Sequence, residues 1–180
     1  MIEAKKLRCA EELKKIPNDK PGYYKWWSTK DAFEQALNAL GMDIATIEAA
    51  VEKSGEYYCI YVGIAAKESI RKRLDWHVND KHTAARVQNG TLSTLRQSIA
   101  SVVAHNQYDK EATDEWIDRL LIEYHCVNCP IKSAEAAEVM HRTERELLAT
   151  NLYIFNIMEN YHPLAGDIKR KLKALRKASK

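Results

Sequence analysis

The chain has 180 residues, of which 46% are hydrophobic and 29% are charged. This composition is typical of one globular domain, with at most a small appendage. No apolar run approaches the roughly 20 residues that a helix needs to span a bilayer, and residues 1–15 lack the apolar core of a signal peptide. We therefore expect a cytoplasmic protein with no membrane partner, whose oligomeric state is left open.

The formal net charge of +3 is distributed unevenly. Residues 169–180 contain seven basic residues and no acid, which leaves 21 basic and 25 acidic residues in the rest of the chain. We expect a single domain at 1–168 and a basic C-terminal tail at 169–180. The tail either contacts nucleic acid or only solubilises the end of a helix. A protein that binds nucleic acid by bulk charge would be more basic, so any such contact is local.

The first elements are a short helix and a strand. Residues 5–15 have the apolar spacing of a helix, and the turn residues at 18–22 follow it. The aromatic run Tyr23–Trp27 comes next and is typical of a β-strand.

A helical segment separates this strand from the next one. Residues 30–53 show two helical apolar faces with Gly41 between them. The aromatic and β-branched run Tyr57–Gly63 then predicts a second strand, which ends at a glycine. We therefore expect a helical insertion at about 28–56 between two paired strands.

A basic helix follows the second strand. Ser69 is a suitable N-cap for it, and Arg71, Arg73 and His77 lie on its first turns. Residues 79–91 are polar and predict a loop, and an apolar helical pattern follows at 92–104. Arg96 on that helix could reach a phosphate, but a solvated arginine is the commoner arrangement.

The last elements are a third strand and a helix that carries an unusual carboxylate. Residues 120–127 predict the strand, and Ser133 is suited to begin the helix. Glu144 falls on the apolar stripe of this helix, whereas Glu146 faces away from it. A carboxylate on an apolar face is costly unless it is paired or binds a metal, so Glu144 marks either a site or an ion pair with an arginine such as Arg73.

In its signature residues the chain resembles the GIY-YIG nuclease family. Gly22-Tyr23-Tyr24 is similar to the first signature of the family and Tyr61-Val62-Gly63 to the second. Arg73 and His77 have the family's four-residue spacing, and Asn156 follows Glu144 at the family's twelve-residue spacing. The resemblance implies an α+β fold in which a small three-stranded antiparallel sheet is flanked by helices.

The resemblance also implies a function and a role for each residue. The chain would be a metal-dependent endonuclease that hydrolyses phosphodiester bonds in DNA through a single Mg²⁺ or Mn²⁺ ion. Tyr24 would orient or deprotonate the water with help from Tyr61, and neighbouring cations would lower the pKa of the tyrosine. The remaining roles are the phosphate ligand, the proton-transfer group, the metal ligand and a supporting group, assigned in that order to Arg73, His77, Glu144 and Asn156.

Two other interpretations remain open. The chain could be a non-catalytic nucleic-acid-binding module that keeps the fold. Cys126 and Cys129 have the spacing of a zinc or redox site, but a structural zinc site usually needs four protein ligands and the sequence contains no second pair of this kind. We therefore expect these cysteines to be packing residues and assign no metal to them.

Overall fold

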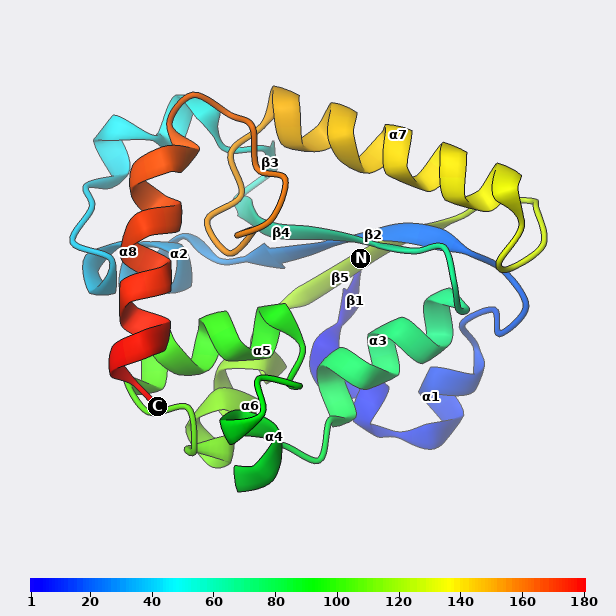
Figure 1. The fold of residues 1–180 in the computed structure, drawn as a ribbon, viewed down its shortest axis with the longest axis horizontal. Coiled ribbons are helices and arrows are strands. Elements are labelled where there is room, and N and C mark those ends of the chain that lie inside the picture. Colours follow the sequence, from blue (N-terminus) through cyan, green and yellow to red (C-terminus); the bar gives the residue numbers. More distant parts are fainter.

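The computed structural model describes all residues 1–180 and has a curled antiparallel sheet at its centre (Figure 1). The strand order is β1-β5-β2-β4-β3, and every neighbouring pair is antiparallel. The strands are β1 (Ile2–Glu3), β2 (Gly22–Ser28), β3 (Lys53–Ser54), β4 (Tyr57–Ala65) and β5 (Leu121–Cys126).

The α+β class is confirmed, but the expected number of strands is wrong. The three strands β2, β4 and β5 correspond to the predicted ones, and β2 lies between the other two. The sheet has five strands because β1 and β3, of two residues each, extend its edges. Neither has the aromatic, alternating pattern that marks a longer strand.

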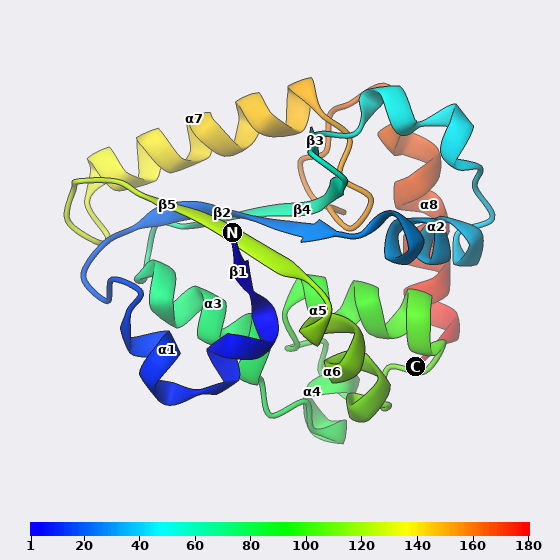
Figure 2. The same cartoon turned by 180° about the vertical axis from the view of Figure 1, so that it is seen from behind.

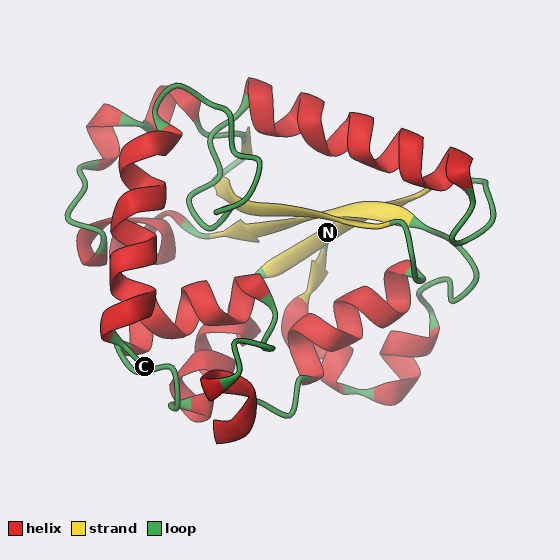
Figure 3. Ribbon diagram, viewed as in Figure 1, coloured by secondary structure: helices red, strands yellow, loops and turns green.

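Helices form layers on both faces of the sheet (Figures 2 and 3). The long helix α7 crosses one face, and α3, α5 and α6 lie on the other, with α2 and α8 at one end. The α-helices are α1 (Ala10–Lys14), α2 (Lys30–Ala39), α3 (Ile70–Asn79), α4 (Ala84–Gln88), α5 (Thr94–Ile99), α6 (Lys110–Asp118), α7 (Ala134–Thr150) and α8 (Ala165–Ala178). The shorter turns are η1 (Ala4–Arg8), η2 (Ile44–Thr46), η3 (Glu48–Ala50) and the π-helical η4 (Ala100–Ala104).

Short polar side chains fix where the helices of the site begin. The Ser69 hydroxyl accepts a hydrogen bond from the backbone N–H of Lys72, and the Ser133 hydroxyl accepts one from Ala136. Both serines are therefore the N-caps that the sequence predicts. The segment 79–91, expected as a loop, contains the short helix α4, which Thr83 caps.

The expected insertion and the expected tail are both packed against the core. Residues 28–56 contain α2 and two 3₁₀ turns, and β3 ends the segment at the edge of the sheet. Residues 169–178 belong to α8, so the expected boundary at 168/169 falls inside a helix. Ile168 and Leu172 of α8 are fully buried, because they form the apolar face of an amphipathic helix. The basic segment is therefore part of a packed helix and not a free tail.

The two faces of the sheet bury different apolar clusters. The larger cluster lies under α3, α5 and α6 and includes Tyr24, Trp26 and Tyr61. A smaller one, which includes Trp27 and Leu148, lies under α7. No helix has both the length and the apolar character of a membrane span.

Candidate active site

The two tyrosine motifs face each other across adjacent strands. Tyr24 on β2 pairs with Gly63 on β4, and Trp26 pairs with Tyr61. A Cβ atom on Gly63 would lie 2.4 Å from the hydroxyl oxygen of Tyr24 and 2.6 Å from its Cζ. Gly63 is therefore required by the close approach of the Tyr24 ring, which explains physically why a glycine ends the second motif.

Tyr24, Tyr61 and His77 form one buried aromatic group. The Tyr24 hydroxyl oxygen lies 2.7 Å from Nε2 of His77, at hydrogen-bonding distance. The ring centroid of Tyr61 is 6.4 Å from that of Tyr24 and 5.9 Å from that of His77. Side chains from β2, β4 and α3 thus meet at one point, although they are more than fifty residues apart in part of the chain.

Burial controls the proton affinities of both tyrosines. Burial and the neighbouring Tyr61 raise the pKa of Tyr24 well above its ordinary value, and the opposing effect of Arg73 is smaller. The pKa of Tyr61 is raised to about 12, first by burial and then by Glu144. The expectation that neighbouring cations lower the pKa of the tyrosine is therefore wrong for the free protein, because loss of hydration outweighs the guanidinium.

His77 has the opposite shift and is a neutral base in this site. Burial, followed by the positive charges of Arg73 and Arg96, lowers the pKa of His77 well below its ordinary value. Only 1% of the surface of His77 is exposed. A neutral imidazole has an acceptor nitrogen, so His77 can accept a proton from the Tyr24 hydroxyl.

Arg96 has a structural position that the sequence did not indicate. It is fully buried, and its guanidinium donates to the backbone carbonyls of His77 at 2.9 Å and Val78 at 3.1 Å. It also forms an ion pair with Asp114. The interpretation of Arg96 as a solvated or phosphate-binding residue is wrong, because it holds the end of α3 that carries His77.

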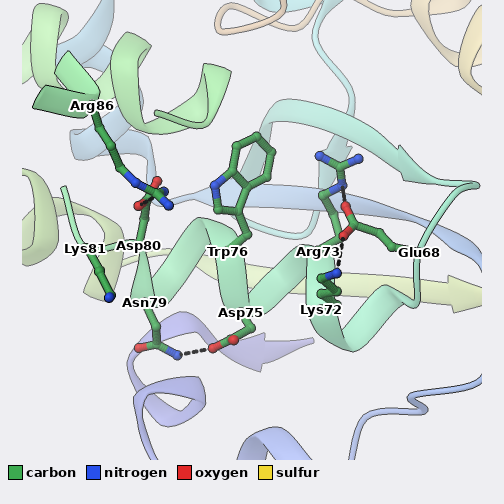
Figure 4. Close-up of a pocket in the computed structure, with 9 residues that line it drawn as sticks. All are labelled: Glu68, Lys72, Arg73, Asp75, Trp76, Asn79, Asp80, Lys81 and Arg86. Atoms are coloured by element: carbon green, nitrogen blue, oxygen red, sulfur yellow. Dashed lines mark hydrogen bonds and ion pairs between the residues drawn. The ribbon is translucent and has the colours of Figure 1, made fainter. Parts of the chain in front are cut away.

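Arg73 lies at the rim of an open hollow beside this aromatic group (Figure 4). Its Nε is 2.9 Å from a carboxylate oxygen of Glu68, and its guanidinium carbon is 5.0 Å from the centroid of the Trp76 ring. The hollow has a volume of about 460 Å³. Arg71 points elsewhere, since it donates to the backbone carbonyls of Ile16 and Lys14.

Glu144 lines a second hollow together with Tyr61 and Asn156. This hollow has a volume of about 180 Å³ and also contains Glu159. Burial raises the pKa of Glu144 to about 7, with a further contribution from Glu159, although Arg73 opposes both. Glu144 forms no ion pair with Arg73; the nearest cationic group is Nδ1 of His141, 4.0 Å away. Glu146 is exposed, as expected.

Asn156 takes the place of a missing strand at the free edge of β4. Because β3 pairs only with Tyr57 and Tyr58, the later residues of β4 have no strand on that side. The Asn156 amide accepts from the backbone N–H of Val62 at 3.0 Å and donates to the carbonyl of the same residue at 2.9 Å. Val62 lies between Tyr61 and Gly63, so Asn156 fixes the backbone of the second motif.

The structure brings the sequence-derived candidates together in two groups and adds residues that the sequence did not reveal. Tyr24, His77 and Tyr61 are in direct contact, whereas Arg73 and Glu144 flank them and Asn156 acts on the backbone. Glu68, Trp76, Thr94 and Glu159 were missed, since each belongs to a polar segment without a distinguishing pattern.

The carboxylates of the smaller hollow suit a hard divalent cation. Glu144 and Glu159 line the same space, and their mutual repulsion contributes to the raised pKa of Glu144. No group of three or more His, Cys, Asp or Glu side chains is arranged to hold a metal ion. Mg²⁺ commonly binds through one or two carboxylates and keeps several waters, so this donor set fits Mg²⁺ better than zinc. Cys126 is exposed and Cys129 is buried, and neither forms a disulfide.

Comparison with known families matches the geometry of this site. A family model described as GIY-YIG catalytic domain matches residues 22–178, from the first strand of the site to the end of α8. Comparison with curated proteins and with solved structures gives no significant match. Since the family match covers most of the chain, the protein belongs to the GIY-YIG nuclease family.

Proposed function

We propose that this protein is a metal-dependent endonuclease that hydrolyses phosphodiester bonds in DNA. The observation that carries the proposal is the 2.7 Å contact between the Tyr24 hydroxyl and the buried, neutral His77. A tyrosine with a raised pKa is a poor base by itself, whereas a tyrosine that can pass its own proton to an imidazole is an effective one. Membership of a nuclease family gives this pair its reaction.

The proposed reaction is an attack of water on the scissile phosphorus. Tyr24 accepts a proton from the water while its own hydroxyl proton moves to Nε2 of His77. The water oxygen then bonds to phosphorus, and the bond from phosphorus to the leaving sugar oxygen breaks. Tyr61 helps to position the water. Solvent returns a proton to the leaving oxygen, and His77 releases its proton in the next cycle.

Arg73 and Glu144 supply the charges that this reaction needs. The Arg73 guanidinium binds the scissile phosphate and stabilises the charge that develops on its oxygens. Glu144 would hold Mg²⁺ or Mn²⁺, with Glu159 beside it, and Asn156 keeps Tyr61 in place. When bound, the ion would supply Lewis-acid stabilisation of the phosphate and of the leaving oxygen.

Nicking of supercoiled plasmid with Mg²⁺ or Mn²⁺ tests this proposal. Wild type should convert plasmid to the nicked form, and Glu144→Ala should abolish cleavage while DNA binding in EDTA stays largely intact. The metal acts mainly in the transition state, so loss of its ligand affects rate more than ground-state binding. Glu146→Ala is the matched control, because this carboxylate is exposed on the same helix.

The competing function is DNA binding without catalysis. A wild-type protein that binds DNA but cleaves none under any divalent ion would establish that function. If Glu144→Ala cleaves as well as wild type, Glu144 is not the metal ligand, and Glu159 becomes the next carboxylate to substitute.

A further inference from the structure

The basic residues of α8 separate into two sets with different surroundings. Three are used within the protein: Lys169 donates to the carbonyl of Asn160, Arg170 pairs with Asp167, and Lys171 pairs with Asp167 and donates to the carbonyl of Gly41. The other four are Lys173, Arg176, Lys177 and Lys180, and none of them forms an ion pair. Their spacing of three, four and seven residues places them on one face of the helix.

These four cations line a hollow that contains no acidic residue. Its volume is about 390 Å³, and its other lining residues are Gly90, Gln97 and Ile157. Figures 1 and 2 show α8 beside α5, which carries Gln97. Lys173, Lys177 and Lys180 are exposed, and Arg176 is half-buried. Four unpaired cations with no counter-charge make this the place on α8 where an external anion is favoured most.

The basic hollow adjoins the hollow of Glu144. Ile157 lines both of them, so one opens beside the other. Arg176 is also close to the catalytic candidate Tyr61: burial lowers the pKa of Arg176, and the Tyr61 hydroxyl acts in the opposite direction. A strand whose scissile phosphate lies at Arg73 and Glu144 could therefore continue over Ile157 to α8.

We propose that the face of α8 formed by Lys173, Arg176, Lys177 and Lys180 binds the phosphates of the DNA strand that continues beyond the scissile bond. This inference rests on the endonuclease function proposed above. The face extends for about 10 Å at the helical rise of about 1.5 Å per residue. Phosphates of one DNA strand are about 3.4 Å apart along the duplex axis, so the face has the length to contact two or three of them.

Salt-dependent binding of a short fluorescein-labelled duplex, measured by anisotropy in EDTA, tests the assignment. The variant replaces Lys173, Arg176, Lys177 and Lys180 by Gln, which keeps a good helix-forming residue at each position. The control carries Arg170→Gln and Lys169→Gln, which remove cations of the same helix that already have partners in the protein. Circular dichroism melting of both variants checks that α8 still packs, and Arg176→Lys tests whether charge alone suffices.

The plot of log binding constant against log salt concentration decides the outcome. Each lost phosphate contact should reduce the magnitude of the slope by about 0.9, so the four-glutamine variant should lose about 2 to 3 from the slope and bind at least tenfold more weakly at low salt. The control should keep the wild-type slope. An unchanged slope in the four-glutamine variant, or an equal loss in the control, would overturn the assignment. Because these measurements need no cleavage, a wild type that binds but never cuts would defeat the endonuclease proposal and leave this one standing.

Discussion

The hydroxyl of Tyr24 occupies the space that any side chain on Gly63 would need. The two residues are partners on adjacent strands, and a Cβ on Gly63 would lie 2.4 Å from the tyrosine oxygen. The glycine of the second motif therefore sets the position of the tyrosine of the first. The position of the Tyr24 oxygen over β4 in turn allows its contact with His77.

Gly63→Ala should reduce cleavage by about a hundredfold or more while the protein still folds. The added methyl group would push the Tyr24 ring away, and a displacement of about 1 Å in a reacting group costs about 10²-fold in rate. Gly166→Ala is the control, since no atom lies within 4 Å of a Cβ at that position. The measurement is single-turnover nicking at saturating protein. Wild-type rates in Gly63→Ala would show that the tyrosine has room to move.

Arg96→Met should destabilise the fold by about 3 to 5 kcal/mol, the usual result of removing one partner from a buried ion pair. The substitution would leave the carbonyls of His77 and Val78 without their donor and deprive Asp114 of a buried cation. Urea unfolding gives the free energy. Lys110→Met is the control, because this half-exposed lysine pairs with the same Asp114 and should cost less than about 1 kcal/mol. Equal losses in the two variants would contradict the role of Arg96.

The central fold could be predicted from the sequence because its signals are local. Aromatic and β-branched runs marked β2, β4 and β5, and the serine caps marked the starts of α3 and α7. The edge strands β1 and β3 could not be predicted, since two-residue strands form only when a neighbouring strand offers its free edge. The burial of Arg96 was hidden for the same reason, because its partners are carbonyls at the end of another helix.

The candidate site was partly predictable because its residues have fixed spacings along single elements. The four-residue step from Arg73 to His77 is one helical turn, and the position of Glu144 on an apolar stripe is a physical anomaly in its own right. Glu159 has neither feature. It lies in a loop with φ of 52°, and only the folded chain brings it beside Glu144. The direction of the Tyr24 pKa shift also depends on burial, which spacing does not reveal.

His77 should make the protein less stable as the pH falls below about 6.5. The pKa of His77 is lowered in the folded state, so the unfolded chain binds more protons than the folded chain in that range. Its contribution is fully present above the unfolded value of about 6.5 and is lost as the pH falls toward the folded value, at up to about 1.4 kcal/mol per pH unit.

Urea unfolding of wild type and His77→Gln at pH 7.5 and pH 5.0 measures this contribution. The decrease in unfolding free energy between the two values should be about 1 to 2 kcal/mol smaller in the variant. His82 also has a lowered pKa, but it is present in both proteins and cancels in the comparison. The same decrease in both proteins would mean that His77 takes up its proton without unfolding.

Arg73 and Arg71 offer a matched pair for the last prediction, because both occupy the first turn of α3. The Arg73 guanidinium lies over Trp76, beside Glu68, and its charge affects the pKa of Tyr24, Tyr61 and Glu144. The Arg71 guanidinium donates to backbone carbonyls near the end of α1. The two side chains therefore differ in their access to a phosphate, although they have the same chemistry.

Arg73→Gln should lower the cleavage rate by about 10² to 10³, the typical loss when one donor to a developing oxyanion is removed. Arg73→Lys should recover only part of this activity, because an ammonium group cannot bind phosphate through two parallel hydrogen bonds. Arg71→Gln should cleave at close to the wild-type rate and unfold at lower urea concentration, since it loses bonds that attach α1 to α3. Nicking kinetics and urea unfolding of all three variants make the comparison. If Arg71→Gln is the inactive variant and Arg73→Gln the active one, the phosphate ligand has been assigned to the wrong arginine.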